Sequence, residues 1–435
     1  MATVTVMIIM PAPVSAHGIG GRSDLPVPVS YFVIGAAVVL ALSFVALAVL
    51  WPEPRLQGWS EGRVIGRWGR WPIVALAVLG LVGLALVIAA GILGEDRRTN
   101  SAPVSVWVYF WLVVPFLGAV VGDLWRHMNP WRTLAGDRQR RAYPHVSPLG
   151  VWPATIAFVA FTWLELVYVD SSSPIVVGTA ALLYSLYVGA AVAVVGKEKA
   201  FGSFEAFTTY NSLVGSIAPL ELDAEGTWRW HGWLRRLPTI PTPRGLTFFV
   251  VAMIGTVTYD GMSASEWWGD LWGSVDREPW FGTLALVGAI AAIGGAYWVA
   301  SWGAARIGGE LTASQVAASF AHSLVPIALA YAVAHYFTLV IFEGQLLWAS
   351  ISDPLGSGRD VFGTAGYRIS FWLSPTTIWY VQLAAIVSGH IAAIALAHDR
   401  ALAIFPKARA VRSQYAMLAL MVGLTGLGLV LLAAG

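Results

Sequence analysis

The stretch from Val29 to Trp51, VSYFVIGAAVVLALSFVALAVLW, contains no charged residue and is almost entirely apolar. As an α-helix it would extend for about 35 Å, which is enough to cross the roughly 30 Å hydrocarbon core of a bilayer. The sequence therefore predicts an all-α protein, a polytopic integral membrane helical bundle with about ten transmembrane helices. Nine more mostly apolar stretches follow, at residues 72–93, 103–122, 150–170, 174–195, 245–261, 279–303, 314–342, 374–398 and 413–433.

The composition of the whole chain also indicates that lipid is its main solvent. The 435 residues are 57% hydrophobic and 11% charged, with a mean hydropathy of +0.69, whereas soluble domains carry roughly 25% charged residues. The absence of cysteine excludes disulfides, iron–sulfur clusters and thiolate zinc sites. A net charge of +2 is too small to indicate nucleic acid. We expect the lipid bilayer as partner and a small molecule as the substrate, if there is one.

The basic residues predict the orientation of the bundle. Twenty of the 26 Lys and Arg residues fall in alternate connections between the predicted spans, and such residues collect on the cytoplasmic side. We therefore expect both termini outside, in a bacterial inner (plasma) membrane. Residues 1–28 would form an outer N-terminal segment and residues 29–435 a single transmembrane domain. The basic connections are 52–71, 123–149, 196–244, 304–313 and 399–412.

Three longer connections have predicted roles. The inner connection 196–244 has apolar residues at helical spacing over residues 200–218, which predicts an amphipathic helix on the inner membrane surface. The outer connections 262–278 and 344–371 are long enough to cover a site, the first as an aromatic vestibule and the second as a lid.

Two histidines within predicted spans have matching depths. His322 and His390 each lie about eight residues, or roughly 12 Å, from the inner ends of their helices. If these helices touch, the two imidazoles suit a haem, copper or other metal ion. The alternative is that both histidines pack between helices and bond to Ser323, Ser388 or backbone carbonyls.

A second group of polar residues is predicted near the outer surface. His335 and Glu343 lie on one span, and Tyr259 and Asp260 end another. An imidazole with carboxylates at one depth suits a divalent metal that activates water. In this interpretation His335 and Asp260 bind the metal, while Glu343 and Tyr259 complete the catalytic shell.

Three other ionisable residues lie in or at the ends of spans. Glu165 is an isolated carboxyl one turn from the outer end of the span 150–170, and His398 and Asp399 close the span 374–398 at the inner surface. Intramembrane acids are functional candidates by default. Glu165 would pair with a cation, belong to a proton path, or bond as a neutral acid to a neighbouring carbonyl.

Several short strings together resemble the actinobacterial polytopic membrane proteins labelled fenitrothion hydrolase-like. They begin with HGIGGRSDLP at His17 and continue over most of the chain, with NPWR at 129–132, SIAP at 216–219, YDG at 259–261, AHSLVP at 321–326, AHY at 334–336, GH at 389–390 and AHDR at 397–400. This resemblance implies hydrolysis of a phosphotriester by metal-activated water. It supplies no catalytic motif that can be carried over to particular residues.

Three functions remain open from the sequence. The first is a membrane-embedded, metal-dependent hydrolase that uses the outer group. The second is a redox subunit in which His322 and His390 bind copper or, less favoured, haem. The third is a transporter whose path includes Glu165 and the histidines of the span 314–342; it requires broken helices near the midplane, for which Pro326 is a candidate position.

Overall fold

The computed structural model describes residues 28–58, 61–136, 149–309 and 311–434. Within these ranges, nine helical stretches are long and apolar enough to cross a membrane, so the chain is a multi-pass helical membrane protein. The one predicted span not among these nine is 150–170, which corresponds to α7 (Trp152–Leu166) and has only 15 helical residues. Six of the nine are continuous helices: α1 (Val29–Leu50), α2 (Trp71–Leu93), α8 (Pro174–Val195), α11 (Leu246–Ser263), α13 (Pro279–Gly308) and α17 (Pro375–Ile404).

The three remaining stretches are interrupted. The third crossing consists of α3 (Ser101–Val104), the π-helix η1 (Ser105–Val113) and α4 (Val114–Val121). The predicted span 314–342 is divided into α14 (Ala313–Phe320), a 3-10 turn η5 (Ala321–Leu324) and α15 (Val325–Phe342), with Pro326 in the first turn of α15. Helix α15 continues through η6 (Glu343–Gln345) into α16 (Leu346–Ser352), and α18 (Lys407–Ala410) and η7 (Arg412–Gln414) precede α19 (Tyr415–Ala434).

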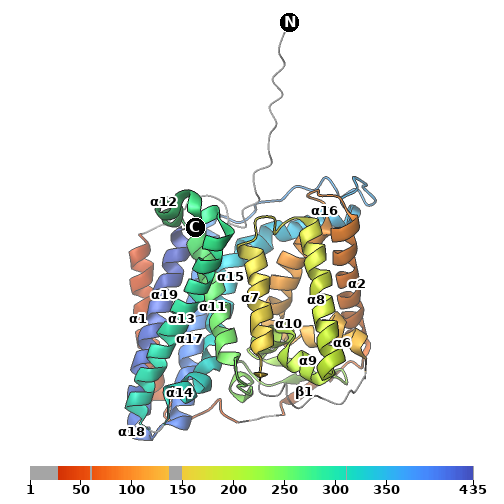
Figure 1. Ribbon diagram of the computed structural model, residues 1–435. Coiled ribbons are helices and arrows are strands. Elements are labelled where there is room, and N and C mark those ends of the chain that lie inside the picture. Colours follow the sequence, from red (N-terminus) through yellow and green to blue (C-terminus); the bar gives the residue numbers. More distant parts are fainter. Residues whose placement is uncertain (1–27, 59–60, 137–148, 310, 435) are drawn as a thin grey trace.

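The first and last long helices pack side by side in opposite directions (Figure 1). The ring centroids of Phe44 and Tyr415 are 6.1 Å apart, while Gly426 lies against Val33 near the other end of α1. The start of α1 and the end of α19 therefore lie at one end of the bundle. We call this the α12 end, because α12 (Glu266–Trp272) lies there. The membrane face to which it belongs stays a prediction.

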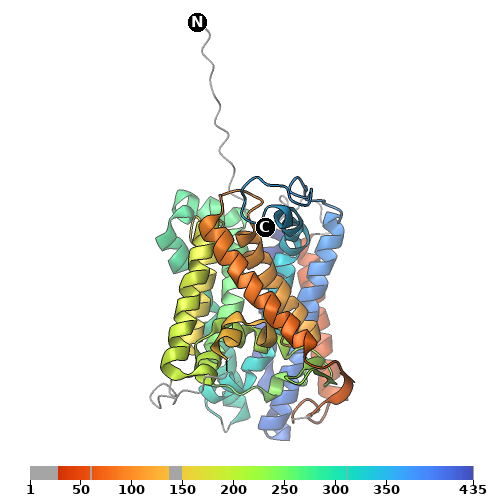
Figure 2. The same cartoon turned by 90° about the vertical axis from the view of Figure 1, so that its right-hand side faces the viewer.

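Helix α2 is strongly tilted and crosses α8 at a close contact (Figure 2). A Cβ atom on Gly91 would lie 2.5 Å from Cα of Gly178, and one on Gly178 would lie 2.7 Å from Cα of Gly91. The two backbones can approach this closely only because both residues lack a side chain, which is the usual way in which helices associate in lipid.

The prediction of an all-helical chain missed a small sheet at the opposite end. Strands β1 (Arg63–Arg67), β3 (Thr227–Trp230) and β2 (Leu220–Leu222) form an antiparallel sheet in the order β1-β3-β2. These strands have three to five residues, and β1 and β3 are separated by some 160 residues in the chain, so local periodicity does not reveal them. The sheet joins the connection after α1 to the predicted inner connection 196–244.

The single amphipathic helix predicted over residues 200–218 is wrong in form. Residues 200–218 contain two helices, α9 (Lys197–Ser203) and α10 (Ala206–Gly215), and eight of the ten residues of α10 are buried. Helix α10 is entered from α9 and left through β2, both at the same end of the bundle. It packs against α4, α7 and α5 (Trp125–Met128). Its polar residues tolerate burial because they bond within the helix, as Asn211 Nδ2 does to the Phe207 carbonyl at 2.9 Å.

Candidate functional site

Asp260 is the centre of a buried polar cluster between α7, α10, α11 and α15. Its Oδ2 lies 2.9 Å from Nε2 of His335 and accepts a hydrogen bond of 2.7 Å from the hydroxyl of Tyr336. Only 3% of Asp260 is exposed. The expected proximity of His335 and Asp260 is therefore observed, and the neighbouring Tyr336 is a partner that sequence reasoning missed.

Helix α11 can present a carboxyl group at this depth because nearly all of its residues are covered by other helices. It packs against α13, α7 and α15, so Asp260 meets protein rather than lipid. The hydroxyls of Thr256 and Thr258 bond back to the carbonyls of Ala252 and Ile254 at 2.9 Å. The two threonine hydroxyls thus donate within α11 and not to Asp260, and the Asp260 carboxylate accepts from a side chain of α15.

Glu165 belongs to the same cluster. Its carboxyl group lies close enough to Asp260 for the two acids to interact electrostatically, and the Trp111 indole of η1 lies beside it. Tyr336 and Tyr210 are within electrostatic reach of Glu165, so α15 and α10 both face this acid. The Trp111 indole is the side chain placed to donate to the Glu165 carboxyl.

The cluster borders a small cavity on the side of His335. The His335 side chain is 19% exposed, and the cavity has a volume of about 20 Å³. Its walls are mainly apolar, with Val257, Ala334, Ile386 and Leu431 among them. A volume of this size has room for about one water molecule, so a large substrate cannot meet the imidazole here.

The predicted outer metal shell is not assembled. Glu343 lies eight residues beyond His335, which is about 12 Å along the helix, and lines a separate pocket with Arg98. The Tyr259 hydroxyl points to α13, where a Cβ on Gly282 would lie 3.1 Å from it. Among the described residues, no group of three or more His, Asp or Glu side chains is placed to hold a metal ion. Glu343 and Tyr259 were grouped with His335 and Asp260 by depth or sequence position, but the helical turn directs their side chains elsewhere.

The predicted inner pair, His322 and His390, lies on packed elements, η5 and α17. His390 Nδ1 bonds to the Ile386 carbonyl at 2.8 Å, and its ring is 5.8 Å from that of Tyr331. His322 lies within electrostatic reach of Asp399 and Arg400, which are about two and a half turns beyond His390 on α17. In the described ranges, no hydrogen bond or ring contact joins the two imidazoles, and neither Nε2 has a partner. A shared haem or metal stays a prediction.

His398 and Asp399 fix the turn that follows α1. The Asp399 carboxylate is fully buried and accepts hydrogen bonds from Trp51 Nε1 at 3.0 Å, from the Leu56 amide at 3.1 Å and from Gln57 Nε2 at 2.7 Å. His398 bonds through Nδ1 to Gln414 and through Nε2 to the Trp51 carbonyl, both at 3.0 Å. These contacts indicate a structural role for the two residues.

Glu205 is a functional neighbour that the sequence analysis did not select. It is fully buried at the start of α10, where its carboxylate caps the helix by accepting from the amides of Phe207 and Thr208. It also accepts from Tyr184 at 2.8 Å, from Asn129 at 3.0 Å and from Trp125 at 3.3 Å. The signal that could have located it is the NPWR string, because Asn129 reaches Glu205 and also caps α6 (Pro130–Ala135).

Comparison with protein-family models, curated proteins and solved structures finds no match to this chain. The site therefore has to be interpreted from its own geometry. His17, which begins the HGIGGRSDLP string, lies outside the described residues, as does the outer N-terminal segment except Pro28.

Proposed function

We propose that this chain is a transporter of a bacterial plasma membrane that moves protons through the cluster of Glu165, Asp260, His335 and Tyr336. The observation that supports this most is the proximity of two buried acids, Glu165 and Asp260, beside an imidazole that borders a cavity of water size. Ionisable groups within a membrane are costly to bury, and those that occur there commonly mark ion or proton pathways. Two carboxyls that interact electrostatically in a poorly solvated site disfavour carrying two negative charges at once.

The surrounding backbone supports a transport function. The π-helix η1 brings Trp111 to Glu165, and α10 brings Tyr210 within electrostatic reach of it. π-Helical turns occur frequently at functional sites, and irregular or broken helices inside a bundle are typical of transporters. In this proposal His335 exchanges a proton with water, Asp260 and Tyr336 relay it, and Glu165 passes it towards α10.

The experiment is a pH jump on proteoliposomes adsorbed to a solid-supported electrode, which detects charge displacement without knowledge of a solute. Wild-type protein should give a transient current, and Asp260→Asn and Glu165→Gln should each reduce its amplitude at least fivefold. The control is Glu198→Gln on α9, whose side chain is 79% exposed. Both variants are nearly isosteric, and thermal unfolding verifies that they are folded. An unchanged current in two folded variants would refute the proposal.

Hydrolysis of a phosphotriester is the second candidate function, because an imidazole oriented by a carboxylate can act as a general base. It requires room for the substrate, and the cavity at His335 has only about 20 Å³, against several hundred for typical small-molecule sites. Proton transfer fits this cavity as it stands. Release of nitrophenol from a nitrophenyl phosphotriester by wild-type proteoliposomes, lost in His335→Ala, would instead favour the hydrolase.

A further inference from the structure

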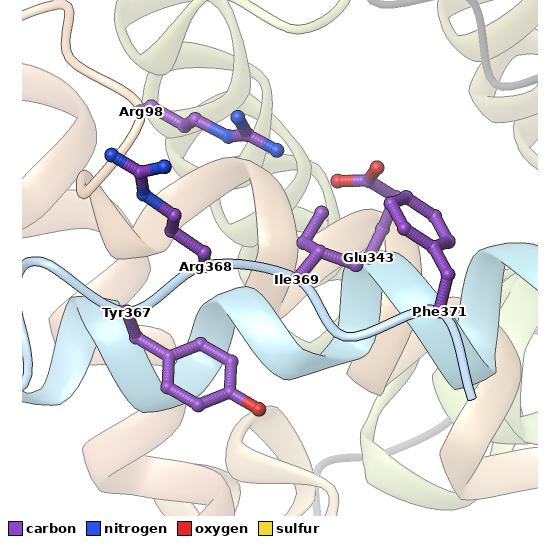
Figure 3. Close-up of a pocket in the computed structure, with 6 residues that line it drawn as sticks. All are labelled: Arg98, Glu343, Tyr367, Arg368, Ile369 and Phe371. Atoms are coloured by element: carbon purple, nitrogen blue, oxygen red, sulfur yellow. The ribbon is translucent and has the colours of Figure 1, made fainter.

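A separate pocket of about 430 Å³ opens at the α12 end, beyond the last turn of α15 (Figure 3). Its size is within the range of small-molecule sites. Two cationic side chains and one anionic side chain line it, together with apolar and aromatic groups. The lining residues are Arg98, Glu343, Tyr367, Arg368, Ile369 and Phe371.

The walls of this pocket are held in place by hydrogen bonds between distant segments. Gln345, two residues after Glu343, accepts from the Tyr367 hydroxyl at 3.0 Å and from the Ser370 amide at 2.9 Å, and donates to the Ser370 carbonyl at 3.0 Å. Ser101 donates to the Pro354 carbonyl at 2.9 Å and so joins the segment that carries Arg98 to the 353–374 connection. The pocket is therefore bounded by fixed segments.

The charged groups of the pocket face one another without direct pairing. Arg98 and Glu343 point towards each other and interact electrostatically, and Arg368 rises beside Arg98 (Figure 3). Within the described residues, neither arginine forms an ion pair with Glu343, because none of their nitrogen–oxygen distances is within 4.0 Å. A ligand between them can therefore meet two guanidinium groups on one side and a carboxylate on the other.

We propose that this pocket binds a compact zwitterion in which an oxyanion and a primary ammonium group are joined by a short chain. Arg98 and Arg368 bind the oxyanion, since guanidinium groups match the geometry of carboxylates and phosphates. Glu343 binds the ammonium group and repels anions that lack one, while Phe371 and Ile369 contact the chain. The same chemistry occurs in soluble phosphoethanolamine and in the headgroup of phosphatidylethanolamine.

The test is calorimetric titration of phosphoethanolamine into the full chain in nanodiscs of phosphatidylcholine and phosphatidylglycerol. Arg368→Gln and Arg98→Gln should each weaken binding about tenfold, as expected for loss of one partly exposed charge-assisted contact. Glu343→Gln should bring phosphoethanolamine and inorganic phosphate to similar affinity. Arg359→Gln, on the same connection but outside the pocket lining, is the matched control.

A second lipid composition distinguishes a soluble zwitterion from a lipid headgroup as the natural ligand. Loss of the calorimetric signal in nanodiscs containing phosphatidylethanolamine assigns the pocket to the lipid headgroup, and an unchanged signal assigns it to a soluble ligand. The proposal is overturned if wild-type protein binds inorganic phosphate as tightly as phosphoethanolamine, or if the arginine variants bind phosphoethanolamine as tightly as the wild type does. It is also overturned if phosphoethanolamine does not bind and phosphatidylethanolamine does not alter the protein's thermal stability. These results are independent of proton transfer, because the assay involves no pH change.

Discussion

Replacement of Glu205 by alanine should be among the most damaging single substitutions in the chain. The change removes the N-cap of α10, which contributes about 1 kcal/mol. It also leaves the Asn129 amide and the Trp125 indole without their shared acceptor in a buried site, at about 1–3 kcal/mol for each donor. The summed loss is about 3–7 kcal/mol in the free energy of unfolding, because Glu205 is 0% exposed and water cannot replace it freely.

Unfolding in mixed micelles, followed by tryptophan fluorescence as the SDS fraction rises, measures this loss. Glu205→Gln keeps one carbonyl oxygen and should cost less, about 1–2 kcal/mol. Glu198→Ala is the matched control, since this exposed glutamate on α9 pairs only with Arg132 at 3.1 Å, and such surface pairs contribute about 0–1 kcal/mol. A loss below 1 kcal/mol in Glu205→Ala would show that α10 is not held by its cap and that its buried donors find other partners.

Two further predictions concern pH and topology. Burial raises the pKa of the Asp123 carboxyl to about 6, although the Arg126 amide and nearby arginines act in the opposite direction. The folded state therefore binds this proton more tightly than the unfolded state does. As a result, the free energy of unfolding falls as pH rises from about 4 to 6. Asp123→Asn should gain up to about 3 kcal/mol over wild type across this interval, with no gain below it, in unfolding titrations at several pH values. Because the chain contains no cysteine, Ser274→Cys should react with an impermeant maleimide on intact cells, and Ala224→Cys only after permeabilisation. The opposite labelling pattern would invert the predicted orientation.

Much of the architecture is determined by composition along the chain. A run such as 29–51 can satisfy its backbone in lipid only as a helix, so nine of ten predicted spans correspond to helical stretches of sufficient length. The alternation of basic connections similarly anticipates that α1 begins where α19 ends. Pro326 marks the interruption of the span 314–342, because proline is best accommodated in the first turn of a helix.

Other features depend on contacts between distant residues. The burial of α10 follows from Glu205, whose partners come from residues 125, 129 and 184, and a local hydrophobic pattern cannot distinguish a buried helix from a surface one. Depth arguments brought His335 and Asp260 together correctly. They failed for Glu343 and Tyr259, because depth along the membrane normal does not specify the direction in which a side chain leaves its helix.

The sequence by itself thus determined the membrane class, the approximate spans and the presence of costly ionisable groups, since each follows from the local balance of apolar and charged residues. Only the tertiary structure decided which of those groups meet. Glu165 lies within electrostatic reach of Asp260 because α7, α11 and α15 pack together, and Tyr210 joins them because α10 packs against α7 and α15. Helix packing in lipid depends on side-chain fit and a few polar contacts between remote segments, and these are properties of the folded chain.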